Sequence, residues 1–292
     1  MTKQDFEQLL ENKPVFLDGA TGSNLRKAGM PRDAVAELWI SEHPQVLQAL
    51  QQQYVAAGSQ ILYAPTFQAT PTAMAKAGLS PKETENLIAR LVSITREAAG
   101  GKALVAGDMT TMAASIDVWD HSNRAVILEN YRRQIAGLLN AGVDLIGAET
   151  LLYPHEGELI WEAAALEGVT VPMVYTYTMD SYGCLFSGAD STPVLRELEE
   201  AGAAAVGFNC VAAGENLPAL VSRLRRQIKC PLISKPNAGD PRVLENGEVL
   251  YPMEKETFAA LQKKAFEFGA GILGGCCGTN PAFIRELRER VG

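Results

Sequence analysis

The chain repeats one hydrophobic pattern, in which an amphipathic stretch ends at glycine and runs into a short apolar segment. The stretches that follow it are "QQQYVAAGSQILYAPTF", "LLNAGVDLIGAET", "LEEAGAAAVGFNC" and "FEFGAGILGGCCG". Glycine after an amphipathic stretch is typical of a helix C-terminus, and a short apolar run between turn residues is typical of a buried strand. The pattern therefore predicts helices that each lead into a buried strand.

Extended along the whole chain, the same pattern predicts eight strands, each followed by a helix. The predicted strands are Val15–Ala20, Gln60–Thr66, Ala103–Asp108, Asp144–Thr150, Pro172–Thr178, Ala204–Cys210, Leu232–Pro236 and Ile272–Gly275. The predicted helices are Pro44–Ala57, Lys82–Ala99, Glu129–Asn140, His155–Leu166, Thr192–Glu200, Leu217–Gln227, Lys255–Phe268 and Pro281–Arg290. Eight such units in about 250 residues plus insertions are typical of a closed (β/α)₈ barrel. We therefore expect an α/β protein, a (β/α)₈ TIM barrel formed as a single domain by residues 1–292.

The alternative fold is an open, doubly wound sheet. Such sheets usually have fewer strands and carry a G-x-G-x-x-G loop after the first. Here the loop after the first predicted strand reads "DGATGSNL", which lacks that glycine spacing. This difference favours the barrel.

Composition narrows the cellular context. The chain is 47% hydrophobic and 21% charged, as in ordinary globular proteins. Its start has no basic flank followed by an apolar core, and no apolar run is long enough to span a bilayer, so we expect a cytoplasmic protein without a membrane partner. A net charge of −8 without a basic cluster argues against nucleic acid. Five cysteines, an odd number without an export signal, indicate reduced thiols.

Polar residues fall where the predicted strands end. In a barrel the loops at the carboxyl ends of the strands form the active site, so these residues are the candidates for chemistry. They are Asp18, Thr66 with Phe67, Asp108, Glu149 with Thr150, Cys210, Asn237, and Cys276 with Cys277.

Three of these strand-end residues are cysteines. Cys210 ends the sixth strand and Cys276 and Cys277 end the eighth, and these strands are only one strand apart in a closed barrel. Three thiolates with a fourth position open are a typical set of ligands for a reactive zinc site, and the surrounding glycines let the backbone bend between adjacent cysteines. Without Cys210, packing or a vicinal disulfide would explain the pair better than a metal site. Cys184 and Cys230 end no strand, and we interpret them as structural or incidental.

Asp18 and Glu149 admit two interpretations. Asp18 would serve as a turn residue or helix cap, and Glu149 as the partner of a buried arginine. Beside a thiolate-bound metal, however, the two carboxylates suit a substrate that carries an ammonium group. Zinc on three thiolates holds a substrate thiol ionised, which predicts attack by substrate sulfur on an electrophilic carbon.

Six motifs, in order along the chain, carry a family resemblance: "DGATGSNL", "TFQAT", "AGVDLIGAET", "GFNC", "PNAG" and "GGCCGT". Together they resemble the homocysteine S-methyltransferase family, most nearly the homocysteine-binding barrel of cobalamin-dependent methionine synthase. The resemblance implies methylation of homocysteine to methionine, with zinc on Cys210, Cys276 and Cys277 and the homocysteine thiolate as fourth ligand. It also implies that Asp18 and Glu149 bind the substrate ammonium, while backbone near Gly19 and the Thr66 position receives the carboxylate.

The methyl donor is left open by the sequence. The third strand runs into "AGDMTTMAASIDVWDHSN", where methionine synthases of the family have a Gly-Pro-Thr-Gly-like turn. The resemblance implies either methylcobalamin on a separate corrinoid protein or a free sulfonium such as S-methylmethionine. Trp119 and His121 in this loop would cover the donor or simply pack locally. If the Asp108–Arg124 segment leaves no room above the metal, a non-catalytic homocysteine- or zinc-binding subunit becomes the better interpretation.

Overall fold

Eight parallel strands form the barrel in the computed structural model, which describes residues 1–11, 14–245 and 247–292. The strands are β1 (Val15–Phe16), β2 (Ile61–Ala64), β3 (Leu104–Met109), β4 (Leu145–Leu151), β5 (Met173–Tyr177), β6 (Ala205–Ala212), β7 (Leu232–Asn237) and β10 (Ala270–Leu273). They pair in the order β1-β10-β7-β6-β5-β4-β3-β2, and a parallel bridge between Leu17 and Ile61 joins the two outer strands. The predicted (β/α)₈ barrel is confirmed.

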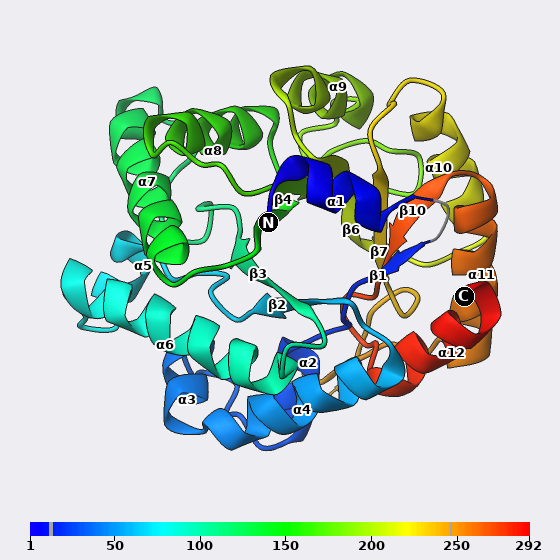
Figure 1. The fold of residues 1–292 in the computed structure, drawn as a ribbon, viewed down its shortest axis with the longest axis horizontal. Coiled ribbons are helices and arrows are strands. Elements are labelled where there is room, and N and C mark those ends of the chain that lie inside the picture. Colours follow the sequence, from blue (N-terminus) through cyan, green and yellow to red (C-terminus); the bar gives the residue numbers. More distant parts are fainter. Residues whose placement is uncertain (12–13, 246) are drawn as a thin grey trace.

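Helices surround the strands as an outer ring (Figure 1). They are α1 (Lys3–Leu9), α2 (Gly22–Lys27), α3 (Ala36–Glu42), α4 (Pro44–Ala57), α5 (Pro71–Ala75), α6 (Pro81–Ala99), α7 (Arg124–Asn140), α8 (Pro154–Leu166), α9 (Ser191–Ala201), α10 (Leu217–Arg225), α11 (Lys255–Glu267) and α12 (Pro281–Val291), with a 3₁₀ turn η1 at His121–Asn123. All eight predicted helices are present. In the described part of the chain, none of the helices is both long and apolar enough to cross a membrane.

Short elements before the first strand and in the connections were not predicted. They are α1, α2, α3, α5, η1 and a small antiparallel hairpin of β8 (Arg242–Val243) and β9 (Val249–Leu250). Helix α7 also begins at Arg124, before the predicted start at Glu129. Helices of a few residues have too few turns to show a hydrophobic period, so pattern alone misses them.

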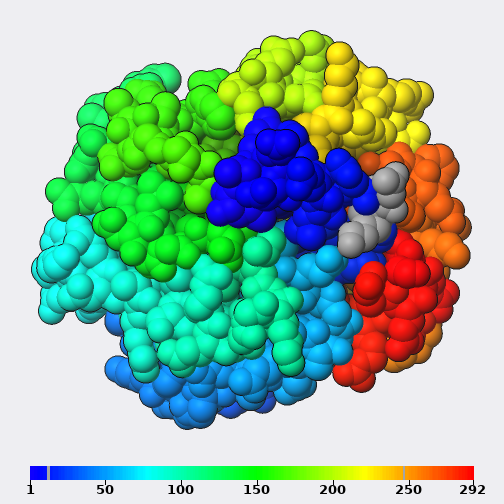
Figure 2. Space-filling model, viewed as in Figure 1, coloured from blue at the N-terminus to red at the C-terminus, as the bar shows by residue number. Residues whose placement is uncertain are grey.

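Helix α1 closes the amino end of the barrel. It begins with a capping box in which Thr2 and Asp5 bond reciprocally, and it lies across the centre of the face shown in Figures 1 and 2. Its Phe6 is fully buried and joins the apolar cluster inside the barrel, with Val15, Leu17 and Ile61 among its members. This end of the barrel is therefore filled by hydrocarbon.

The opposite end of the same strands carries polar side chains. Because successive strand residues alternate between faces, the residue two positions after an interior apolar residue also points inward. On β7, for example, Ile233 belongs to the interior apolar cluster and Lys235 follows it toward the carboxyl end. The upper interior layer therefore contains Tyr63, Asp108, Thr176 and Lys235, each two positions after a residue of the apolar cluster, and Glu149 and Asn209, each four positions after one. The barrel thus changes from an apolar to a polar interior along its axis.

Candidate metal centre and acceptor site

Three cysteine thiols meet at the carboxyl end of the barrel. The Sγ atoms of Cys210, Cys276 and Cys277 lie within 4.8 Å of one another, and those of Cys210 and Cys276 are 2.7 Å apart. All three are free cysteines. The structure therefore brings together the three thiols that the sequence predicted would converge.

The backbone is irregular at the ends of two strands beside this cluster, and this irregularity sets the direction of the side chains there. The pairing of β4 shifts register between Ala148 and Leu151, and that of β6 between Asn209 and Ala212. Thr150 and Cys210 lie in these shifts with φ of 58° and 56°, the left-handed region that non-glycine residues rarely adopt. Bulges next to active sites re-aim side chains, and strain of this kind concentrates where function requires it.

The turn that carries Cys276 and Cys277 depends on glycine. Gly278 has a φ of 83°, and a Cβ there would lie 2.3 Å from the Cβ of Tyr251. The ring of Tyr251 thus packs directly on the turn, and any larger residue at position 278 would displace it. This confirms the expectation that glycine permits the bend at the adjacent cysteines.

Without a metal the cluster shares one negative charge. Hydrogen bonds from Cys210 and Cys276 lower the pKa of Cys277 to about 3. Hydrogen bonds to Cys210 and Cys277, together with burial, raise the pKa of Cys276 well above its ordinary value. One thiolate is thus held by two protonated neighbours.

Asn209 supports the cluster from below. It is fully buried, and its Oδ1 accepts hydrogen bonds from the Thr150 amide (2.8 Å) and the Thr176 hydroxyl (2.9 Å). Its Nδ2 donates to Thr150 Oγ1 at 2.6 Å and also reaches Cys210 Sγ at 3.6 Å. Asn209 was not among the residues predicted from the sequence, although it precedes Cys210 in the "GFNC" motif.

The donor set suits a thiophilic metal. In tetrahedral coordination at about 2.3 Å, two sulfur ligands of one zinc ion lie about 3.8 Å apart. The three Sγ atoms, all within 4.8 Å of one another, therefore need only small shifts to bind one ion. The remaining side of the cluster faces a cavity, which leaves a position for a further ligand. Cys184 and Cys230 are not members of the cluster, as predicted.

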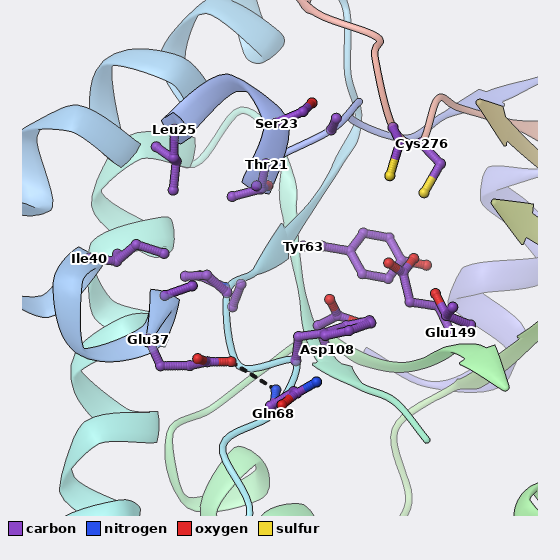
Figure 3. A pocket seen from close by; sticks show the side chains of 18 of the residues that line it. Thr21, Ser23, Leu25, Glu37, Ile40, Tyr63, Gln68, Asp108, Glu149 and Cys276 are labelled. Atoms are coloured by element: carbon purple, nitrogen blue, oxygen red, sulfur yellow. Dashed lines mark hydrogen bonds between the residues drawn. The ribbon is translucent and has the colours of Figure 1, made fainter. Parts of the chain in front are cut away.

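A cavity of about 640 Å³ opens over the thiols. Figure 3 shows Cys276, Tyr63, Asp108 and Glu149 on one side of it and Leu25, Ile40 and Glu37 on the other. The buried Glu37, which accepts a hydrogen bond from the Gln68 amide at 2.8 Å, comes from α3 and was not predicted. A volume of this size lies in the usual range for sites that bind small molecules.

Two buried aspartates line the cavity with unpaired oxygen atoms. Asp18 Oδ2 accepts a hydrogen bond from the Tyr63 amide at 2.9 Å, but its Oδ1 has no partner. The Oδ1 of Asp108 is also buried and without a partner. Burial, opposed by Lys235, raises the pKa of Asp18 to about 7, and burial and the nearby Glu149 raise the pKa of Asp108. Both groups therefore gain from a cation that enters the cavity.

Glu149 already has a cation beside it. The Nζ atom of Lys235 lies 2.5 Å from Glu149 Oε2 and 3.9 Å from the centre of the Tyr63 ring. Burial acts to lower the pKa of Lys235, but Glu149 and neighbouring acidic groups outweigh it and hold that pKa well above its ordinary value. Lys235 is absent from the residues predicted from the sequence. Its signal is a single lysine in the apolar run "LISKPNAG".

Gly19 and Thr66, the predicted carboxylate-binding positions, differ in their placement. Gly19 lines the cavity, and a Cβ there would lie 2.7 Å from both Thr279 Oγ1 and the Tyr54 hydroxyl, so only glycine fits without movement. Thr66 is fully buried, and it does not belong to the described residues that line the cavity. Its hydroxyl donates to the Asp108 carbonyl and accepts from the Asp108 amide, both at 2.9 Å. Thr66 therefore ties β2 to β3, and its role in substrate binding stays a prediction.

The Asp108–Arg124 segment leaves the space over the thiols open. Asp108, Ala114 and Ser115 of this segment line the cavity. Trp119 and His121 instead line a separate cavity of about 320 Å³, where the Trp119 ring packs against Tyr153 at 4.6 Å between centroids. The local-packing interpretation of Trp119 thus fits the structure.

Fold and site together define a (β/α)₈ barrel with three converging thiols beneath a polar cavity. The family model described as homocysteine S-methyltransferase matches residues 15–291. The chain belongs to the homocysteine S-methyltransferase family.

Individual relatives agree with this assignment. The chain is 26% identical to the homocysteine S-methyltransferase YbgG of Bacillus subtilis, over 96% of each protein. It is 27% identical to the methionine synthase of Mycobacterium tuberculosis over 98% of its own length, but spans only 25% of that protein. The metallated homocysteine methyltransferase MmuM from Escherichia coli has a similar structure, with a TM-score of 0.82 and 26% identity over 97% of this chain and 98% of that one.

Proposed function

We propose that this protein is a zinc-dependent enzyme that methylates the thiol of homocysteine and so forms methionine. The observation that carries the proposal is the convergence of the Cys210, Cys276 and Cys277 thiols at the floor of an acidic cavity. When bound by these thiols, zinc would keep the acceptor thiol ionised at neutral pH, where a free thiol is mostly protonated.

The protein residues would orient the acceptor. The cavity over the thiols confines the substrate sulfur, and acidic groups around it suit the ammonium of an amino acid. When the protein holds the sulfur and the methyl group in line, a bimolecular encounter becomes a reaction between two bound groups. This positioning alone can lower the activation free energy by several kcal/mol. Among the residues that the structure describes, no histidine lines the cavity, in agreement with a displacement that needs no general base.

The leading candidate for the donor is a methylated corrinoid on a separate protein. The resemblance of the motifs to the homocysteine-binding barrel of cobalamin-dependent methionine synthase supports it. The chain spans about a quarter of the length of the two methionine synthases that it matches.

A free sulfonium such as S-methylmethionine is the second candidate. The cavity of about 640 Å³ extends beyond the thiols to the walls formed by α2 and α3, and it has room for two small molecules side by side. This volume favours a small diffusible donor.

One anaerobic experiment separates these candidates. Zinc-loaded protein is mixed with homocysteine and methylcobalamin while the cobalamin spectrum is followed, and a parallel reaction with S-methylmethionine is scored by methionine formed. Demethylation that requires Cys210 would support the corrinoid donor, and methionine formed from the sulfonium alone would support the second. Zinc-loaded protein that binds homocysteine but accepts neither methyl group would favour the non-catalytic binding subunit.

A further inference from the structure

Lys235 is the one lysine in the upper interior layer of the barrel. It lies on β7 two residues after the interior Ile233, and its side chain is 5% exposed. Burying an ammonium group costs free energy unless the group is paired and hydrogen-bonded. A buried lysine that lines the proposed substrate cavity therefore calls for a functional explanation.

The ammonium group of Lys235 has more hydrogen-bond donors than the protein uses in the described residues. Among the described residues, Glu149 is the hydrogen-bond acceptor for Nζ, and the Tyr63 ring lies under it at 3.9 Å. An ammonium group has three donors, so Lys235 retains hydrogen-bonding capacity for a ligand in the cavity that it lines.

The charges around Lys235 divide into two groups. Glu149 is neutralised by Lys235, whereas Asp18 and Asp108 each keep a buried oxygen without a partner. A substrate ammonium bound to Glu149 would lie beside the Lys235 ammonium, and like charges at such short range repel strongly in a buried site. Asp18 and Asp108 offer the same ammonium two buried oxygen atoms that no hydrogen bond occupies.

We propose that Lys235 binds the α-carboxylate of the acceptor thiol, and that Asp18 and Asp108, rather than Glu149, bind its ammonium. This inference rests on the proposed function, because it assigns the two charged groups of homocysteine to different residues of the cavity. It replaces two expectations from the sequence, the role of Glu149 as ammonium ligand and the binding of the carboxylate by backbone near Gly19 and the Thr66 position. Glu149 becomes the positioning residue that holds Lys235.

The test compares three thiols by anaerobic calorimetry on zinc-loaded protein. Homocysteine carries both charged groups, 3-aminopropane-1-thiol lacks the carboxylate, and 4-mercaptobutanoate lacks the ammonium. In the unmodified protein, loss of the carboxylate should weaken binding by about 10- to 100-fold, the usual effect of losing a charged hydrogen bond. In Lys235→Met this difference between homocysteine and 3-aminopropane-1-thiol should fall to near unity, with zinc content unchanged.

Two further variants keep the result interpretable. Lys235→Met leaves Glu149 buried without its cation and so threatens folding, whereas Lys235→Met/Glu149→Gln removes both charges together and should also abolish the discrimination. Lys76→Met is the matched control. Lys76 also lines this cavity, but its ammonium group donates a hydrogen bond to the Ser115 carbonyl. It should preserve the full difference between the two thiols.

Each outcome separates the inference from the function on which it rests. A difference that persists in both Lys235 variants overturns the carboxylate assignment alone. Binding of 4-mercaptobutanoate as tightly as homocysteine by the unmodified protein overturns the ammonium assignment and homocysteine as the preferred acceptor, even if Lys235 proves to hold the carboxylate. Failure of all three thiols to bind overturns both the proposed function and the inference.

Discussion

The two ends of the barrel are built from the same strands and have opposite character. At the amino end, Phe6 of α1 is fully buried against interior apolar residues such as Leu17 and Ile61. At the carboxyl end, the next interior layer contains a buried ion pair between Lys235 and Glu149 and leads to three thiols.

The amino end of the barrel therefore serves mainly stability, and the carboxyl end holds the groups that would carry out the chemistry. The described non-glycine residues with positive φ, Thr150 and Cys210, lie at the carboxyl end, as do the unpaired oxygens of Asp18 and Asp108. These features cost free energy, and the apolar contacts of the rest of the barrel offset that cost. The comparison predicts that changes at one end leave the other largely intact.

The largest effect is expected from the thiol cluster. Cys210→Ala should abolish stoichiometric metal binding and lower the rate of methyl transfer by at least about 10³-fold, because the change removes one of the three proposed metal ligands. The melting temperature of the metal-free variant should stay close to that of the metal-free parent. Metal analysis, an activity assay and thermal unfolding check these outcomes.

The matched control for that change is Cys230→Ala. Cys230 is half-buried at the turn before β7, and its amide is bonded to the Glu199 carboxylate. Its replacement should leave the metal content at one per chain. Loss of metal in both variants, or global unfolding of Cys210→Ala, would contradict the separation of the two ends.

The amino end should show the reverse behaviour. Phe6→Ala removes a fully buried ring and should lower the free energy of unfolding by about 3–5 kcal/mol. Metal bound per folded molecule should not change. Urea unfolding followed by circular dichroism, with metal analysis at low urea, measures both; a metal site lost before unfolding would show that the ends are coupled.

A smaller effect is expected from pH. Asp18 has a folded-state pKa of about 7, above its ordinary value of 3.8, so the folded protein retains a proton that the unfolded chain has released. Stability should therefore fall as pH rises, by about 2 kcal/mol from roughly pH 5.5 to 7. In Asp18→Asn the curve should be flatter, and an unchanged slope would show that Asp18 ionises normally in the folded protein.

The smallest effect is expected outside both ends. Trp119 is 56% exposed and lines the second cavity, so Trp119→Ala should change stability by less than about 1 kcal/mol. Homocysteine affinity and methyl transfer should stay unchanged. A marked loss of transfer with unchanged homocysteine affinity would instead place Trp119 at the donor.

The periodic elements were predictable because their signals are local. Glycine after an amphipathic stretch marks the end of α4 at Ala57 as predicted, and the repeated units imply the barrel topology. Convergence of Cys210 with Cys276 and Cys277 was predictable once the barrel was inferred, because the ends of parallel strands in a closed barrel face one cavity. Helices as short as α2 and α3 gave no such periodic signal, and so the wall that carries Glu37 was missed.

The amino-acid sequence by itself determined the barrel, the three thiols at its mouth and the family to which the chain belongs, because each depends on residue type and order along strands. Only the tertiary structure decided which charged groups face one another. The pairing of Lys235 with Glu149 joins β7 to β4 across the barrel interior, and the unpaired oxygens of Asp18 and Asp108 depend on how closely these side chains are packed. Such contacts are set by distances across the barrel, which no local pattern of residues records.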